Sequence, residues 1–145
     1  MARTQPLQIQ KLDPVWDRIR AEAEEARDRD PALAGFLYAA ILNHGGSEEA
    51  LLRRTAQPMG NADIGADVVL KAFEDALEAD PDIGAAARAD VIATFDRDPA
   101  CHRYLEPLLY FKGFQAVQTH RIAHRLYRLG RIHLAYYLQS RASLV

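Results

Sequence analysis

Apolar residues recur every three or four positions along most of the chain, which is the spacing of an α-helix that buries one face. Stripes of this kind predict helices over residues 14–29 and 31–43. Further helices are predicted over 47–52, 63–79, 81–95, 113–129 and 131–142. No stretch alternates apolar and polar residues consistently enough to predict a strand. The pattern therefore predicts an all-α protein.

The last two predicted helices and the segment before them need a closer description. Pro107 cannot donate to a central sheet ladder, so 104–112 is predicted to be a helical turn or an extended connector. Gly130 is expected either to stop or to kink the helix over 113–129. The side chains expected to face inward on the two helices are Phe114, Val117, Ile122, Leu126, Leu129, Ile132, Ala135, Tyr136 and Leu138.

Asp-Pro dipeptides are typical of helix starts, because the aspartate side chain caps an amide and proline at the first helical position loses no hydrogen bond. Ser47 is a further candidate cap, for the short helix that follows it. The dipeptide occurs at Asp13-Pro14, Asp30-Pro31, Asp80-Pro81 and Asp98-Pro99. We therefore predict a multi-helix bundle of about seven or eight helices, four of them opened by Asp-Pro caps. It should form one domain over 1–145, with 1–12 as a flexible lead-in.

Composition narrows the class of protein. With 145 residues, 49% of them hydrophobic, the chain can bury a core and is not a disordered protein. The single cysteine, Cys101, excludes an internal disulfide and a cysteine-based zinc finger. No apolar run approaches the roughly 18 residues of a membrane span. We expect a cytoplasmic protein without membrane contact.

Charge is unevenly distributed along the chain. Residues 101–145 carry seven lysines and arginines against Glu106 alone, whereas 1–100 are acidic overall. The arginines at 121, 125 and 128 could contact phosphates of a nucleic acid. The alternative is that the acidic and basic parts attract each other or another subunit. We favour the second interpretation and expect no nucleic-acid binding, since the acidic remainder would repel a polyanion.

The spacing of residues alone identifies few candidates for a catalytic or ligand-binding role. His120 and His124 stand four apart, as metal ligands on a helix can, but the arginines around them disfavour a divalent cation, so no metal site is expected. The sequence has no glycine-rich phosphate loop and no nucleophile elbow. Asp98, after Arg97, is a cap or a carboxylate for a cationic ligand such as an ammonium group. Spacing favours the cap.

Longer motifs resemble a known family. They are Arg97-Asp98-Pro99-Ala100, then Pro107-Leu108-Leu109-Tyr110-Phe111-Lys112-Gly113-Phe114-Gln115-Ala116, and then His120-Arg121-Ile122-Ala123-His124. In this order they resemble the N-terminal helical domain of bacterial and plant serine O-acetyltransferases. The similarity covers essentially the whole chain. One departure is Tyr127, where many members carry tryptophan.

The resemblance implies an activity for the complete family protein. Members transfer acetyl from acetyl-CoA to the hydroxyl of L-serine and so make O-acetylserine for cysteine biosynthesis. L-cysteine inhibits them from the serine pocket. They assemble as dimers of trimers through helical domains like this one, and O-acetylserine sulfhydrylase binds their extreme C-terminal tail. Their second domain is a left-handed parallel β-helix, which holds coenzyme A.

The resemblance also assigns roles residue by residue. The general base, a histidine oriented by a carboxylate, comes from the β-helix domain, which is missing after 145. We therefore expect no catalytic residue in this chain, no cofactor bound by it, and no activity of the chain alone. Asp98 is the one functional position that is carried over, as a contact for the ammonium of serine or cysteine. The alternative is a stand-alone helical assembly module without an enzymatic role.

Overall fold

The computed structural model describes residues 12–145, and its described part is helical without a strand. The α-helices are α1 (Pro14–Arg29), α2 (Ala34–Leu37), α3 (Ser47–Ala56), α4 (Ala66–Ala79), α5 (Asp82–Arg97), α6 (Leu105–Tyr110), α7 (Lys112–Arg128) and α8 (Ile132–Ala142). Short helices of other types are η1 (Pro31–Leu33), η2 (Tyr38–Leu42) and η3 (Gln57–Met59). The predicted all-α fold is confirmed. The predicted lead-in over 1–12 falls almost wholly outside the described residues.

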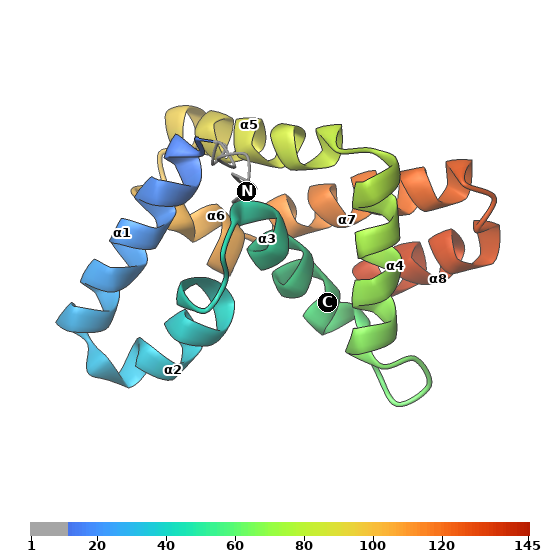
Figure 1. Ribbon diagram of the computed structural model, residues 1–145, viewed down its shortest axis with the longest axis horizontal. Helices are drawn as coiled ribbons and strands as arrows, with labels where there is room; N and C mark the ends of the chain where they lie inside the picture. The colour runs from blue at the N-terminus through green and yellow to red at the C-terminus, as the bar shows by residue number, and fades with distance from the viewer. Residues whose placement is uncertain (1–11) are drawn as a thin grey trace, which may run out of the picture.

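The helices pack as a bundle with one long central element (Figure 1). α7 contacts α3, α4, α5 and α6 and is paired most extensively with α8, which returns beside it. Gly130 makes this return possible, because its φ of 86° lies in the left-handed region that glycine adopts without strain. Its amide donates to the carbonyl of Tyr127 at 3.0 Å, and the amide of Arg131 donates to that of Leu126 at 2.9 Å. Gly130 therefore stops the helix rather than kinking it.

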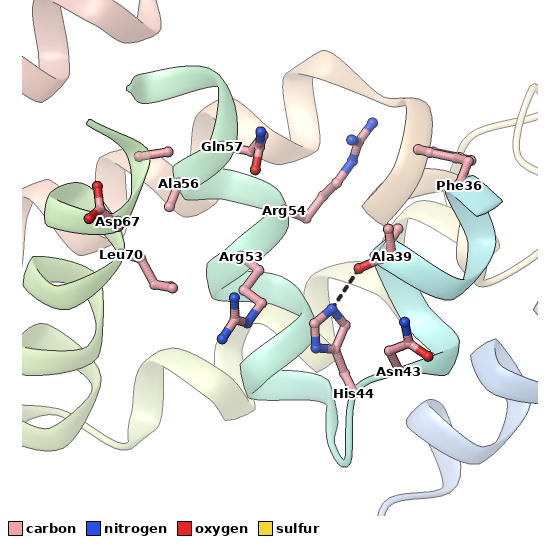
Figure 2. A pocket seen from close by; sticks show the side chains of 12 residues that line it. Phe36, Ala39, Asn43, His44, Arg53, Arg54, Ala56, Gln57, Asp67 and Leu70 are labelled. Carbon is pink, nitrogen blue, oxygen red and sulfur yellow. Dashed lines mark hydrogen bonds between the residues drawn. The ribbon is translucent and has the colours of Figure 1, made fainter. Parts of the chain in front are cut away.

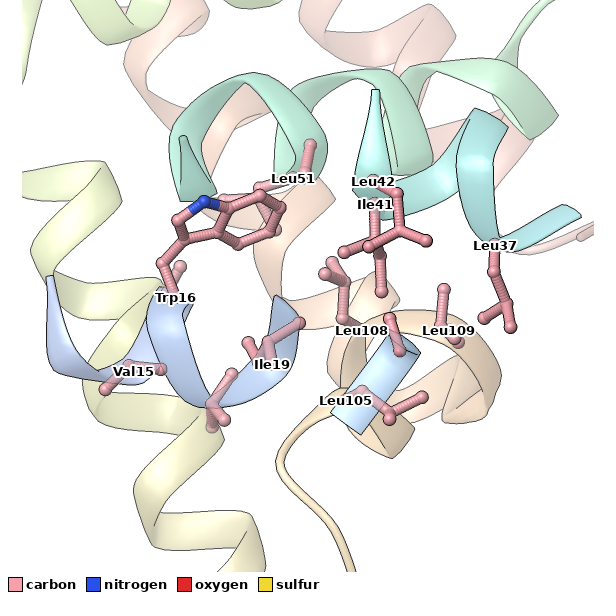
Figure 3. Packing of buried hydrophobic residues seen from close by; sticks show 14 of the residues in the cluster. Val15, Trp16, Ile19, Leu37, Ile41, Leu42, Leu51, Leu105, Leu108 and Leu109 are labelled. Atoms are coloured by element: carbon pink, nitrogen blue, oxygen red, sulfur yellow. The ribbon is translucent and has the colours of Figure 1, made fainter. Parts of the chain in front are cut away.

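Two hydrophobic clusters form the core. The first joins α1, α2, η2, α3, α5, α6 and the start of α7 around Trp16, which is 5% exposed (Figure 3). The second joins α3, η3, α4, the start of α5, α7 and α8 around Phe73, which is fully buried. Since α3, α5 and α7 contribute to both clusters, they hold the two halves of the bundle together.

The predicted inward faces of α7 and α8 are only partly correct. Phe114, Ile122, Leu126, Ala135 and Leu138 are buried, as expected. Four side chains that were expected inside are 40–55% exposed, namely Val117, Leu129, Ile132 and Tyr136. Each lies at the flank of an apolar stripe, where helical spacing cannot tell burial within the chain from an uncovered apolar surface.

Side-chain capping explains where only some of the described helices begin. The Asp13 carboxylate accepts from the Trp16 amide at 3.0 Å, and α1 begins at Pro14 as predicted. Asp30 and Asp80 also accept from an amide two residues ahead, although the helix predicted over 31–43 is divided into η1, α2 and η2. The Ser47 cap is wrong, because Ser47 donates to Asp13 at 2.6 Å and α3 has Gly46 at its N-cap.

The fourth Asp-Pro dipeptide does not open a helix, which corrects the prediction of four such starts. Asp98 ends α5, and the chain turns before α6 begins at Leu105. The amides of Tyr104 and Leu105 each donate to the carboxylate of Glu22 at 3.3 Å, across more than 80 residues of sequence. Glu22 is buried on α1 and also accepts from Arg18 at 3.0 Å. The start of α6 is thus set by a tertiary contact rather than by the local dipeptide.

Candidate functional site

Asp98 lies at the end of α5, lines a groove, and has one of its two carboxylate oxygens engaged in a hydrogen bond. Its amide donates to the carbonyl of Thr94 at 2.9 Å, which closes the last turn of the helix. Its Oδ1 accepts from the amide of Ala100 at 2.8 Å, and its carbonyl accepts from that of Cys101 at 3.0 Å. Among residues 12–145 no group donates to Oδ2. The turn therefore fixes the orientation of the carboxylate and leaves Oδ2 able to accept a hydrogen bond from a ligand.

The groove beside Asp98 has a volume of about 740 Å³ and runs between α5 and α7. The α5 side presents the guanidinium of Arg97 and the carboxylate of Asp98, and the α7 side presents mostly apolar surface. No histidine lines it within the described part of the chain. The lining residues are Asp90, Ala93, Thr94, Arg97, Asp98, Pro99, Phe111, Gly113, Phe114, Val117 and Gln118. Such a groove suits a small ligand with a cationic group, but its lining offers no histidine as a general base.

A polar cluster around a buried glutamine forms one part of this groove, and the sequence does not predict it. Gln118 is fully buried, and its Nε2 donates to Asp90 Oδ2 at 2.8 Å. Arg121 Nη1 donates to the same carboxylate oxygen at 3.0 Å and to Gln118 Oε1 at 2.7 Å. The one available signal was the spacing of three between Gln118 and Arg121, which puts both on one face of α7.

Cys101 follows Asp98 closely but offers no reactive thiolate. Its side chain is buried, and its Sγ lies 3.3 Å from the carbonyl of Arg103. Burial raises the pKa of the Cys101 thiol, and the negative charge of Glu106 raises it further. At neutral pH the group therefore remains a thiol, which is a poor nucleophile.

Ion pairs within the described chain engage three of the seven basic residues of the C-terminal segment. Arg103 Nη1 lies 2.9 Å from Glu25 Oε2, Arg121 pairs with Asp90, and Arg131 Nη1 lies 3.2 Å from Asp75 Oδ2. The hydrogen bond from Arg103 lowers the pKa of Glu25, which is consistent with a formed pair. The expected attraction between the acidic and basic parts is confirmed. Arg121, one of the three candidates for phosphate contact, is occupied in this way.

The two spaced histidines lie on a different surface from Asp98. His120 and His124 line a groove of about 320 Å³ between α7 and α8, together with Tyr127, Tyr136 and Gln139. Neither a carboxylate nor a thiol lines it. In residues 12–145, no group of three or more His, Cys, Asp or Glu side chains is arranged to hold a metal ion.

A third hollow, of about 620 Å³, lies between η2, α3 and α4 (Figure 2). Its histidine, His44, is buried with Nε2 2.8 Å from the carbonyl of Ala39 and Nδ1 3.2 Å from Glu49. Arg54 donates to the carbonyl of Leu109 at 2.7 Å. Because these groups already hold neighbouring elements together, the Asp98 groove remains the better candidate site.

Comparison with known proteins agrees with the helical fold. A family model described as "Serine acetyltransferase, N-terminal" matches residues 15–119. The chain belongs to the serine acetyltransferase family. Serine acetyltransferase 4 of Arabidopsis thaliana is 42% identical over 133 residues, which cover 92% of this chain and 38% of that protein.

Solved serine acetyltransferases share the fold. The enzyme from Brucella abortus strain S19 has a TM-score of 0.89 at 51% identity, over 92% of this chain and 55% of its own. The Neisseria gonorrhoeae enzyme, solved in complex with serine, has a TM-score of 0.87 at 41% identity, over 92% and 55%. Other structures hold coenzyme A or cysteine. The chain thus spans about half the length of these solved relatives. No helix in its described part is both long and apolar enough to cross a membrane.

Proposed function

We propose that this chain is the helical half of a serine O-acetyltransferase. The complete protein would transfer acetyl from acetyl-CoA to the hydroxyl of L-serine and produce O-acetylserine for cysteine biosynthesis. Family membership and the relatives solved with serine, with cysteine and with coenzyme A support this activity. One observation links the proposal to a particular site. The Asp98 carboxylate lines the groove between α5 and α7, and its Oδ2 accepts no hydrogen bond from residues 12–145.

Asp98 would bind the substrate rather than carry out the chemistry. The ammonium of serine donates a charge-assisted hydrogen bond to Oδ2, while the Ala100 amide keeps Oδ1 in place. L-cysteine carries the same ammonium, so it competes for the same carboxylate. This contact orients the amino acid and leaves its hydroxyl free to meet a base and acetyl-CoA supplied by other polypeptide.

The chain alone is expected to be inactive. A serine hydroxyl needs a general base within hydrogen-bond reach, and no histidine lines the Asp98 groove. The test compares residues 1–145 with a chimera in which this chain is joined at Val145 to the second half of the Brucella abortus enzyme. Acetyl transfer is followed by the release of free coenzyme A. Turnover by the chimera alone supports the proposal, and serine-dependent turnover by the isolated chain, or none by the chimera, contradicts it.

We further propose that the domain takes part in self-assembly, in the complete protein as the contact between two trimers. The support is apolar surface at the end of α7 and on α8, where Leu129, Ile132 and Tyr136 are 40–55% exposed. This surface also fits the alternative of an assembly module without enzymatic role. Binding to O-acetylserine sulfhydrylase through a C-terminal tail, and a cytoplasmic location, stay predictions.

Self-association is expected at micromolar concentration, because the exposed apolar side chains of α7 and α8 are removed from water when copies associate. Sedimentation velocity of residues 1–145 measures it directly. The matched variant replaces Ile132 and Tyr136 by serine, on the exposed side of α8 and away from the Asp98 groove. A shift of the unmodified chain to oligomers that this variant loses supports the proposal. If both the unmodified chain and the variant are monomers, the proposed self-association of the isolated domain is contradicted.

A further inference from the structure

The cluster of Asp90, Gln118 and Arg121, hereafter the Asp90 cluster, surrounds one buried amide and joins the two walls of the groove that holds Asp98. Asp90 is on α5, whereas Gln118 and Arg121 are on α7. Gln118 is fully buried, yet its amide nitrogen and its amide oxygen both have partners, at 2.8 and 2.7 Å. A satisfied network around a buried amide favours one arrangement of the elements it joins, since a slip of one helix along the other would leave the Gln118 amide unpaired at low dielectric.

The cluster is also connected to Asp98 through the last two turns of α5. The hydroxyl of Thr94 donates to the carbonyl of Asp90 at 2.7 Å, and the amide of Asp98 donates to the carbonyl of Thr94 at 2.9 Å. On the opposite wall, Val117 directly precedes Gln118 and lines the same groove. The register between the Asp98 carboxylate and the α7 wall is therefore held from one end by the Asp90 cluster and from the other by the turn at Pro99.

We propose that Asp90 and Gln118 are positioning residues for the amino-acid substrate. They set the distance between Asp98 and the α7 wall, and so the width available to serine or cysteine. The inference rests on the proposed function of Asp98 and extends it to residues that contact no reacting atom. Leucine at 118 would fill similar volume without the two hydrogen bonds, so α5 and α7 would stay packed while their register became less restricted.

The first test uses the chimera with Gln118→Leu, and with Thr119→Val as the matched control. Thr119 is 2% exposed on the same helix, does not line the Asp98 groove, and donates only to the carbonyl of Gln115 within its own helix, at 2.9 Å. Gln118→Leu is expected to raise the KM for serine roughly 5- to 10-fold while kcat changes less than about 2-fold, because ground-state positioning is lost. Thr119→Val should change neither constant.

A second variant separates positioning from simple loss of stability. Gln118→Glu places a carboxyl beside Asp90, with Arg121 on its own helix and Arg97 and Asp98 on the facing wall. The carboxyl must be protonated to donate to Asp90. Burial and the negative charge of Asp90 favour that protonated form, against the opposing effect of the Arg121 guanidinium. The KM of this variant relative to the unmodified chimera should therefore fall as pH is lowered from about 8 to about 6.

The outcomes distinguish this inference from the proposed function. If Asp98→Asn raises the serine KM and the Gln118 variants do not, the Asp90 cluster is only structural and the inference is overturned. A flat KM ratio for Gln118→Glu across pH, or equal effects of Gln118→Leu and Thr119→Val, overturns it as well. If Asp98→Asn itself has no effect, the proposed role of Asp98 fails first, and the inference that rests on it fails with it.

Discussion

Asp98→Asn in the chimera is expected to raise the KM for serine about 10- to 100-fold, corresponding to the roughly 1.5–3 kcal/mol of a hydrogen bond to a charged group. Inhibition by cysteine should weaken by a similar factor, because the same carboxylate would receive either ammonium. Asparagine keeps an oxygen that accepts from the Ala100 amide, so the turn after α5 is preserved and only the charge is lost. Steady-state kinetics with serine varied, without and with cysteine, measure both effects.

Asp96→Asn is the matched control for this prediction. Asp96 is exposed, lies two residues before Asp98 on the last turn of α5, and does not line the groove. The Asp96→Asn substitution removes a negative charge from the same region as Asp98→Asn does. Any general electrostatic effect on the approach of the substrate therefore appears in both variants. A rise in KM without a matching loss of cysteine inhibition, or equal effects of the two variants, would show that Asp98 serves only to close the turn.

Trp16→Ala is expected to cost about 3–5 kcal/mol of unfolding free energy, which is a large share of the 5–15 kcal/mol of a typical domain. Trp16 is 5% exposed in the first hydrophobic cluster, where α1 meets α3 and α5 (Figure 3). Alanine leaves a cavity that these helices cannot fully close. Urea unfolding of residues 1–145, followed by circular dichroism, gives the change in free energy from the midpoint and slope.

Tyr136→Ala supplies the comparison, because it also removes a large aromatic ring but from a side chain that is 55% exposed. Its effect should stay within roughly 0.5 kcal/mol, as for other surface substitutions. Similar losses for the two variants would contradict the assignment of the core. So would a fall in the unfolding slope for Trp16→Ala alone, since the midpoint would then no longer report the packing of that ring.

Local sequence predicted those parts of the fold that local physics determines. α1 begins after Asp13 and ends at Arg29 as predicted, because a side-chain cap and an apolar stripe act within a few residues of each other. The Asp98-Pro99 dipeptide was misleading for the opposite reason. The start of α6 depends on Glu22, whose carboxylate comes from another helix and receives the amides of Tyr104 and Leu105.

The candidate site was predictable only in part. Spacing alone favours Asp98 as the cap of a helix start, and this prediction is wrong, because Asp98 ends α5 instead. Its role in a pocket entered through the resemblance to serine O-acetyltransferases, and the structure adds the groove beside it. Gln118 was not predicted, since a single buried amide belongs to no recognisable motif. The exposure of Leu129 and Tyr136 also escaped prediction, because helical spacing does not reveal what covers an apolar stripe.

The central claim is that Asp98 of this helical domain binds the amino group of serine. The most direct measurement is a crystal structure of the chimera with serine bound. The account predicts serine in the groove between α5 and α7, its nitrogen at hydrogen-bond distance, about 2.7–3.2 Å, from Asp98 Oδ2. Serine held entirely by the second half of the chimera, with Asp98 Oδ2 turned to solvent, would contradict it.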